Sequence, residues 1–414
     1  MRQLKPTFLL GAALLAAGAS AGCSDEDLRE AGRNIQQSVG QRWETWRRGI
    51  DDATKAEARR RAQAKATARP GVEPAGAGEA EQPIDEGPEA IRPATSLDAA
   101  GLAEIVAFAE QQRAQSLTVK LGGKTVVARR WGRQDDLHAM MQMTYPIVAL
   151  TMGQLVAEGK IPSLDAPLGR WLPAFREGEK TSVTLRHVMA GRDQLKGPEP
   201  WPGGLYRQPD YLRFYAGTAL EGTPGQGQVL PNESVVLLGA VVKAATGMPL
   251  DRWVGTRLFE PLGITRSRWR KDKAGNVDAW AGLWLPPAGA LKIGELVLNE
   301  GRWNGRQVLP RDWVIEATSP AGVSDLPDHP EIHGYGWRVA TRWRAFDTRP
   351  TQRRMADRRY GFQASDYIGN QLIVHPQKRL VALHTVPWDG EPITRSINDF
   401  VFDSLAGMLD EAAR

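Results

Sequence analysis

The feature that most limits how this chain can fold is a stretch of low hydrophobicity at residues 69–93. It reads RPGVEPAGAGEAEQPIDEGPEAIRP, which is rich in Pro, Gly, Ala and Glu and has few large apolar residues. Such a composition cannot bury enough surface to offset the entropy cost of ordering, so we predict a disordered linker. The one large domain of the chain is then expected after the linker, over residues 94–414.

The first 23 residues are typical of a targeting segment. A cationic start precedes the run FLLGAALLAAGASAG, which is too short to span a bilayer comfortably, and Cys23 follows as the only cysteine of the chain. The segment resembles a bacterial lipoprotein signal, with Ser20 where the usual signal has Leu. Lipidation of Cys23 would anchor the chain to a membrane. Since Ser24 and not Asp follows, the resemblance implies the cell envelope, at the periplasmic face of the outer membrane. The alternatives are an ordinary cleaved signal, giving a soluble periplasmic or secreted protein, and a soluble N-terminal helix.

Residues 24–68 carry apolar side chains at helical spacing, interrupted by glycines, and then an Ala- and Arg-rich part. We interpret this segment as a helical tether between the anchor and the linker. A second interpretation is that the helix itself docks the protein at a membrane surface. The apolar positions are Leu28, Ile35, Val39, Trp43, Trp46 and Ile50.

Composition argues against several classes of function. The net charge of +5 is small for 414 residues, and no basic stripe interleaved with aromatic residues is present, so nucleic-acid binding is not expected. No glycine-rich phosphate loop or metalloprotease signature occurs, and we expect no cofactor. His329 and His333 have a spacing used by metal ligands, but Pro330 between them argues against a shared helix, so no metal site is expected.

Helices and strands alternate at both ends of the domain. A capped apolar helix is expected at 96–115, then two strands over 116–131 around a Gly-Gly-Lys turn. Another helix is expected at 144–159, with Pro in its first turn and Gly at its end. A hairpin over 367–387 and a helix over 397–412 close the chain. This pattern predicts an α/β domain with an inserted, mostly helical part.

Five segments of the domain carry recognisable motifs in a recognisable order. They are PIVALTMGQLVAEGKIPSLDAPLGRWLPAF (146–175), TLRHVMAGRDQL (184–195), PNESVVLLGAVVKAATGMPLDRWVGTRLFEPLGITRSRW (231–269), KIGELVLNEGRWNGRQVLPRDWVIEATSP (292–320) and GYGWRV (334–339). Together they resemble the β-lactamase-related serine hydrolases: class C β-lactamase-like esterases, penicillin-binding D-amino-acid peptidases and nylon-oligomer hydrolases. The resemblance implies a β-lactamase-like antiparallel sheet flanked by N- and C-terminal helices, with the helical domain inserted.

The chemistry of that family requires Ser and Lys in an S-x-x-K pattern, one helical turn apart so that a proton can pass between them. Aligned on PIVAL, the serine position holds Gln142 and the lysine position holds Tyr145. Gln has no nucleophilic oxygen, and Tyr cannot supply a cationic amine. No Ser of the chain is followed three residues later by Lys. The nearest hydroxyl belongs to Thr144, which we expect to cap the helix.

A second family pattern, Y-x-N, supplies a general base and an amide that orients the substrate. Here Leu230 stands at the Tyr position and Asn232 at the Asn position. Asn232 could hydrogen-bond a ligand amide, but we favour its reading as a cap of the helix that begins at Glu233.

The third pattern, written H-T-G, K-T-G or A-S-G-x-x-G-Q, forms one wall of the oxyanion site. This chain reads QASDYIGNQ, which keeps Ser365 but replaces the first glycine with Asp366. A carboxylate there is expected to oppose the negative charge that develops during acyl transfer. Gln371 would either face a ligand or serve the geometry of the sheet.

Losses at all three motifs, together with Asp193-Gln194 in place of a Ser-Gly turn, favour an inactive enzyme fold. We therefore predict an envelope lipoprotein whose domain binds or scaffolds, with a peptidoglycan-related ligand or a protein as partner. The alternatives are an active esterase, amidase or D-amino-acid peptidase that uses non-standard residues, and surface docking through the N-terminal helix. The candidate ligand cleft comprises Thr144, Tyr145, Asn232, Ser365 and Gln371.

Overall fold

The structure is a computed structural model, and it describes residues 102–103, 106–107, 109–110, 114–131, 137–198, 204–226, 233–324, 331–339, 361–366 and 369–387. The predicted targeting segment, tether, linker and closing helix lie outside the described residues. So do three single positions on which the sequence analysis relied: Cys23, Leu230 and Asn232.

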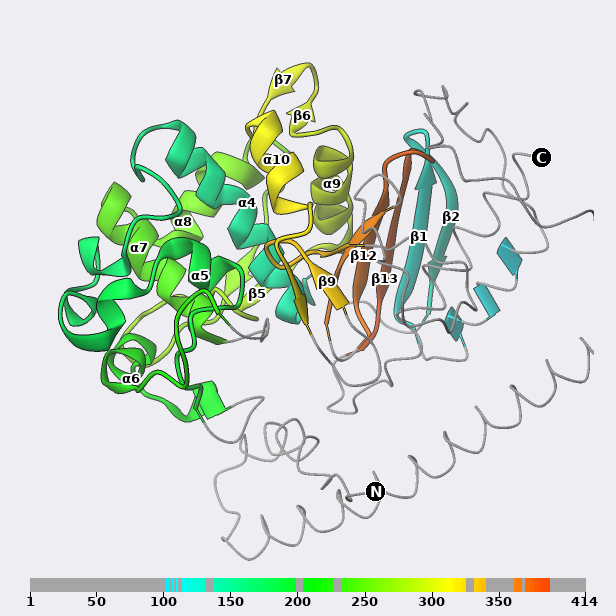
Figure 1. Cartoon of the computed structure of the whole chain (residues 1–414). Helices are drawn as coiled ribbons and strands as arrows, with labels where there is room; N and C mark the ends of the chain where they lie inside the picture. The colour runs from blue at the N-terminus through cyan, green and yellow to red at the C-terminus, as the bar shows by residue number, and fades with distance from the viewer. Residues whose placement is uncertain are drawn as a thin grey trace, which may run out of the picture. The chain divides into compact units, whose positions relative to one another are not determined.

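An antiparallel sheet of eight strands stands beside the helices of the domain (Figure 1). Its order is β2-β1-β13-β12-β11-β10-β9-β8, so early and late segments of the chain lie side by side. Both predicted hairpins are confirmed, because β1 pairs with β2 and β12 pairs with β13. The strands are β1 Ser116–Leu121, β2 Lys124–Arg130, β8 Gly322–Ser324, β9 Glu331–His333, β10 Arg338–Val339, β11 Phe362–Ser365, β12 Gln371–His375 and β13 Leu380–Thr385.

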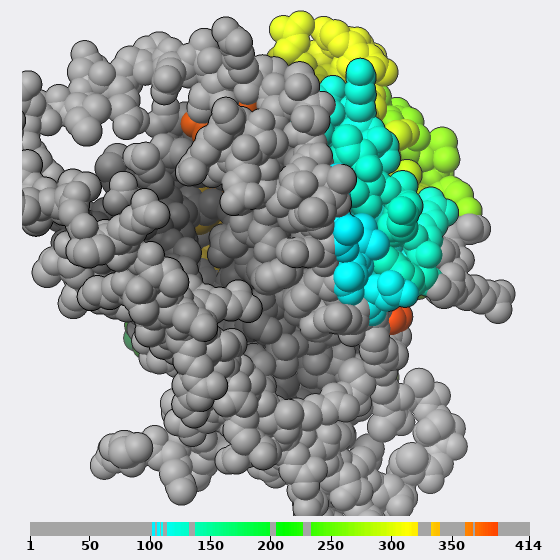
Figure 2. Space-filling model, turned by 90° about the vertical axis from the view of Figure 1, so that its right-hand side faces the viewer, coloured from blue at the N-terminus to red at the C-terminus, as the bar shows by residue number. Residues whose placement is uncertain are grey.

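The two faces of the sheet pack into different cores. Along β13, Val381 and Leu383 join the large core that the sheet shares with the helices, whereas Leu380 and Ala382 join a smaller core on the other face. This alternation follows from the two-residue period of a strand. Strands β12 and β13 are consequently buried along their whole length. The edge strand β2 instead lies at the surface, where it is drawn in cyan in Figure 2, and only its Val127 is buried.

The opening helix contributes to the smaller core. The described residues of the predicted 96–115 segment that carry a helical backbone include Leu102, Val106 and Ala109, and all three pack into this core. Their spacing places them on one face of a helix, so the sheet is covered from this side as predicted.

Helix α9 (Pro287–Leu298) covers the opposite face by packing on β12 and β13. Gly294 permits the close approach, since a Cβ there would lie 2.7 Å from Val381 Cγ1 and 2.8 Å from Leu372 Cδ1. A larger residue would push the helix away from the sheet. The predicted α/β class, with helices on both faces of an antiparallel sheet, is therefore confirmed.

The inserted part between the sheet's two halves is mostly helical. Its long helix, α4, runs from Thr144 to Ala157 and is buried over nearly its full length. The other helices are η2 Met141–Met143, η3 Leu168–Arg170, η4 Pro173–Phe175, η5 Gly178–Ser182, α5 Leu185–Met189, η6 Gly204–Arg207, α6 Tyr211–Gly217, η7 Glu233–Val236, α7 Leu237–Thr246, α8 Leu250–Val254, η8 Gly255–Phe259 and α10 Arg311–Ala317.

Two small sheets complete the described fold. One has the order β3-β5-β4, with β3 His138–Ala139, β4 Arg268–Trp269 and β5 Leu283–Leu285. The other pairs β6 Arg302–Trp303 with β7 Arg306–Gln307. Strand β3 matters most for function, because it leads directly into η2 and α4.

Within the described ranges, no single helix has the length and apolar character needed to cross a membrane. One bent pair, Glu233–Thr246 with Leu250–Phe259, meets the length and composition requirement jointly, and many of its side chains belong to the large core.

Candidate functional site

Gln142 lies in the short turn η2, between strand β3 and helix α4. The turn is held by the N–H of Met140, which donates to the carbonyl of Leu283 at 2.8 Å. Met141 has a φ of 44°, in the left-handed region that side chains other than Gly rarely adopt. Such a conformation persists where the surroundings impose it, and it is common at functional sites. The half-buried Gln142 side chain has its Oε1 buried with no hydrogen-bond partner.

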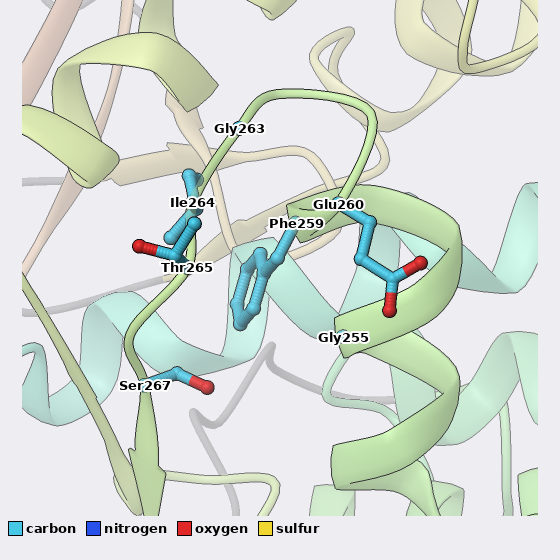
Figure 3. A pocket seen from close by; sticks show the side chains of 7 residues that line it. All are labelled: Gly255, Phe259, Glu260, Gly263, Ile264, Thr265 and Ser267. Atoms are coloured by element: carbon cyan, nitrogen blue, oxygen red, sulfur yellow. The ribbon is translucent and has the colours of Figure 1, made fainter.

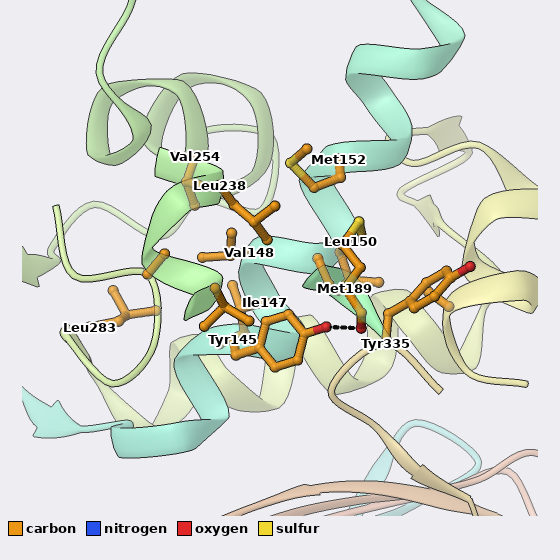
Figure 4. Packing of buried hydrophobic residues seen from close by; sticks show 14 of the residues in the cluster. Tyr145, Ile147, Val148, Leu150, Met152, Met189, Leu238, Val254, Leu283 and Tyr335 are labelled. Atoms are coloured by element: carbon orange, nitrogen blue, oxygen red, sulfur yellow. Dashed lines mark hydrogen bonds between the residues drawn. The ribbon is translucent and has the colours of Figure 1, made fainter. Parts of the chain in front are cut away.

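Tyr145 follows one helical turn later and points into the core instead of toward an open cleft. Its hydroxyl donates a hydrogen bond to the carbonyl oxygen of Met189 in α5, as Figure 4 shows. The side chain is 8% exposed. Gly336 makes room for the ring, because a Cβ there would lie 2.8 Å from Tyr145 Cδ1, and its φ of +77° also suits glycine.

Burial keeps Tyr145 neutral. It raises the pKa of the Tyr145 hydroxyl well above its usual value, and the nearby Tyr335 and Asp193 add to the effect. A tyrosine that holds its proton and gives it to a backbone carbonyl cannot accept a proton from a neighbouring nucleophile. The position of the family lysine is thus occupied by a packed, uncharged ring.

Thr144 does not cap helix α4, and that prediction was wrong. The N-cap residue is Met143, which makes no side-chain cap. The Thr144 hydroxyl oxygen instead accepts the N–H of Leu283 in β5 at 3.1 Å, and the side chain is fully buried. The fold brings strand β5 close enough to bind this hydroxyl. A sequence pattern along one helix does not reveal a partner on a distant strand.

Strand β11 brings Ser365 to the same region, because this strand packs against η2. Ser365 is half-buried, and Arg338 Nη1 lies 3.4 Å from its hydroxyl oxygen. Gln371 is its register partner on β12 but is fully buried, with its Nε2 3.5 Å from Gln363 Oε1. Of the two readings of Gln371, the structural role in the sheet is the one that its burial favours.

The carboxylate of Asp366 is held by its own turn. Its Oδ1 accepts the N–H groups of Gly369 at 2.8 Å and Asn370 at 2.9 Å, and its Oδ2 accepts Asn370 Nδ2 at 2.6 Å. The residue is 5% exposed. These hydrogen bonds close the β11–β12 turn, and the expected opposition of this charge to an oxyanion stays a prediction. An Asp that serves its own turn and one that faces a ligand look alike in sequence.

Sequence reasoning missed a buried pair beneath Tyr145. The Ser234 hydroxyl donates to Asp193 Oδ2 at 2.7 Å, and Asp193 Oδ1 accepts the N–H of Leu195. A hydroxyl facing a carboxylate is the kind of pair that an active enzyme could use. Here Ser234 is 0% exposed and Asp193 is 1% exposed, so no substrate reaches the hydroxyl. Gln194, the next residue, has a φ of 59°, which is the conformation that a glycine would favour in that turn.

A cavity of about 370 Å³ lies at the end of the segment α8–η8, and none of the predicted site residues lines it. In Figure 3 the carboxylate of Glu260 lies on the other side of the Phe259 ring from the hydroxyls of Thr265 and Ser267. The cavity therefore does not pair a hydroxyl with a base. Among the residues that the structure describes, no cluster of His, Cys, Asp or Glu could hold a metal ion.

The sequence of this chain is similar to that of known β-lactamase-related proteins. The β-lactamase family model matches residues 103–398. Esterase EstB from Burkholderia gladioli is 33% identical over 175 residues, which are 37% of this chain and 42% of the relative. The match thus spans less than half the length of that relative.

Solved structures agree in fold. A penicillin-binding protein homologue from Pyrococcus abyssi, described as octameric, superposes with a TM-score of 0.57 and 16% identity over 75% of this chain and 77% of its own. A D-stereospecific amidohydrolase from a Streptomyces species gives a TM-score of 0.54 and 17% identity, over 73% of this chain and 98% of its own. With a family match over most of the domain and this shared fold, the chain belongs to the β-lactamase family.

Proposed function

We propose that this protein is an envelope lipoprotein whose β-lactamase-family domain is catalytically silent and serves binding or scaffolding. The observation that carries the proposal is the state of Tyr145, whose buried hydroxyl donates to the Met189 carbonyl where the family places a lysine amine.

Acyl transfer requires a nucleophile paired with a base. A nucleophile must lie within about 3 Å of a group that takes its proton. Gln142 carries no such nucleophile, and Tyr145 keeps its own proton and so offers no base, since burial raises its pKa. Loss of a nucleophile or its base costs on the order of a millionfold in turnover in comparable enzymes. Residual binding contacts do not restore such a factor.

The remaining hydroxyls near η2 do not substitute for a serine. Thr144 is fully buried and accepts a backbone N–H, and Ser234 is fully buried against Asp193. Ser365 is half-buried, and its hydroxyl oxygen lies near the guanidinium of Arg338, which is a cation and cannot act as a base. These surroundings support binding over turnover. We extend the proposal to a peptidoglycan-related ligand or a protein partner, which the amide of Gln142 and the hydroxyl of Ser365 would contact.

The experiment is covalent labelling of the purified chain with a fluorescent penicillin and with a fluorophosphonate, followed by intact mass measurement. We expect no adduct and no ester turnover above buffer. Thr144→Val and Ser365→Ala variants serve as matched controls, because each deletes one hydroxyl near η2. A mass increase by one acyl group that disappears in either variant would overturn the proposal.

The anchor is tested separately. Cys23→Ala removes the only thiol of the chain. We expect the variant to leave the membrane fraction, because a lipidated cysteine is the proposed anchor. Unchanged fractionation of the variant with membranes would contradict the lipoprotein assignment and leave the catalytic proposal untouched.

A further inference from the structure

Asn370 joins strand β3 to its own turn and to the residue that follows β13. Its Nδ2 donates to Asp366 Oδ2 at 2.6 Å and to the carbonyl of Ala139 at 3.3 Å. Its Oδ1 accepts the N–H of Val386 at 3.0 Å and lies 2.9 Å from His138 Nε2. Asn370 is fully buried. It therefore fastens β3, the strand that leads into the Gln142 turn, to the large sheet.

These contacts determine the orientation of the groups. Since the amide nitrogen of Asn370 is bound to Asp366 and Ala139, the atom facing His138 is the amide oxygen. An oxygen accepts, so His138 Nε2 must carry a proton and donate it. The tautomer of His138 thereby follows from its partner.

His384 lies near these groups, and one of its two ring nitrogens makes no hydrogen bond. Its Nδ1 lies 2.8 Å from the carbonyl of Gly369, and a carbonyl only accepts, so Nδ1 carries the proton. Its Nε2 is then a bare lone pair, buried with no hydrogen-bond partner, and the side chain is 1% exposed. Burial lowers the pKa of His384, the Gly369 carbonyl partly opposes this, and His138 lowers it further.

The charged surroundings of His384 are few. Its register neighbours are Leu117 on β1 and Gln371 on β12, and neither carries a charge. The titratable groups of the cluster are His138 on β3 and Asp366 in the β11–β12 turn, and the Asp366 carboxylate is occupied by Gly369 and Asn370. Within the described part of the chain, no carboxylate is thus placed to neutralise a proton on His384 Nε2.

We propose that Asn370, His138 and His384 form an acid-sensitive clasp that holds the Gln142 turn on the large sheet. At neutral pH the His384 ring, whose pKa is lowered by burial, is neutral and the clasp is closed. In acid a proton from solvent binds His384 Nε2, which becomes a buried donor without an acceptor and a cation beside His138. Opening of the β3 segment away from Asn370 exposes the ring to water, which relieves the cost of the unsatisfied donor and the cost of the buried cation.

The inference is independent of the proposed function, because it concerns how the turn is held and not what the turn binds. Its consequence is that acid releases the segment on which the candidate cleft is built. The opening takes up one proton, so its equilibrium constant should rise by at most about tenfold per pH unit below the unfolded-state pKa of histidine, about 6.5.

Two measurements on the full chain test the clasp. First, the protein is labelled with ¹³C in its histidine rings and titrated by NMR; six histidines give a spectrum of few signals. Second, hydrogen exchange of residues 137–145 is followed by mass spectrometry at pH 7.5 and 5.5, corrected for intrinsic rates. We expect the His384 signal to titrate below pH 6.5 and exchange in this segment to accelerate severalfold in acid, more than exchange in α9.

His384→Asn is the variant of choice, since its Nδ2 can donate to Gly369 as Nδ1 does but cannot titrate. It should abolish the acid-dependent acceleration in residues 137–145. His375→Asn, a buried histidine on the neighbouring strand, is the matched control and should leave the acceleration intact. The proposal is overturned if His384 titrates at its ordinary value, or if wild type and His384→Asn accelerate equally. If the variant fails to fold, the wild-type titration decides alone.

Discussion

Helix α4 meets different surroundings along its body and at its first turn. Along the body, Gly153 lies against the indole ring of Trp313, and the indole Nε1–H donates to the carbonyl of Leu150 at 3.0 Å. Gln154 donates to the carbonyls of Arg257 and Val308. At the first turn, Tyr145 fills a lysine's place with a ring, and Gln142, like Gln154 in the body, has its side-chain oxygen buried without a partner.

The contrast shows that packing and chemistry place separate demands on one helix. The body is surrounded by close contacts that hold α4 against α10. The first turn needs particular side chains only if a substrate must be acylated. A chain can therefore keep the packing of the helix body in full while its first turn lacks the side chains that catalysis requires. Variants in the helix body and at the first turn separate these two demands.

The largest effect is expected in the helix body. In Gly153→Ala the new Cβ would lie 1.9 Å from Trp313 Cγ, so the ring or the helix must shift. Overpacking of this kind typically costs 1–3 kcal/mol, and we expect about 3 kcal/mol or more, measured by urea unfolding. Gly255→Ala is the matched control, since a Cβ there meets nothing within 4 Å, and it should change stability by less than about 1 kcal/mol. Equal effects of the two variants would contradict the packing argument.

The second prediction concerns alkaline pH. Burial raises the pKa of both Tyr145 and Tyr215 well above their usual value, whereas in the unfolded chain both ionise near about 10. Their contribution to stability is therefore complete below pH 10 and is lost as pH rises, by up to about 1.4 kcal/mol per pH unit for each group. Urea unfolding at pH 9, 10 and 11 measures this slope. Tyr145→Phe should make the slope shallower by about one proton, and an unchanged slope would refute the buried state of Tyr145.

At neutral pH the same variant has a smaller effect. Tyr145→Phe deletes one hydroxyl and leaves the carbonyl of Met189 without its donor. A buried acceptor left unsatisfied costs about 1–3 kcal/mol, and we expect a loss near the lower end because the ring packing is retained. Thermal unfolding measures it. Tyr335→Phe, which removes a buried hydroxyl bonded to the exposed side chains of Arg186 and Glu316, gives a comparison outside the first turn.

The smallest effect is expected at Gln142. Its Oε1 is buried without a partner, so replacing the side chain removes an unsatisfied group and few favourable contacts. Gln142→Ser should change the free energy of unfolding by less than about 1 kcal/mol. It should also gain no label from a fluorescent penicillin, because no base adjoins the new hydroxyl. Labelling of this single variant would show that only the nucleophile is missing. The first turn would then differ from an active one at one residue.

The fold was predictable in large part from local patterns. Alternating apolar residues in 116–131 and 367–387 predicted the hairpins, and the segment after Thr144 predicted a buried helix that Gly159, with a φ of 68°, then ends. These features depend on neighbours in sequence, and their spacing is visible in the letters. The absence of Ser and Lys at Gln142 and Tyr145 was visible in the same way.

What each polar side chain does depended on partners distant in sequence. Thr144 bonds to Leu283, Tyr145 to Met189, and Asn370 to Ala139, across separations that no local pattern spans. The oxygens of Asp366 accept N–H groups of its own turn, a role that the sequence pattern did not indicate.

The sequence by itself determined that the S-x-x-K pair is missing, because side-chain chemistry is a property of each residue alone. Only the tertiary structure decided what replaced that pair: a neutral ring bonded to α5, and a turn fastened to the sheet through Asn370 and His138. The physical reason is that a hydrogen bond or a buried charge is defined by two groups and their surroundings. The chain brings those groups together only when the helices and strands pack.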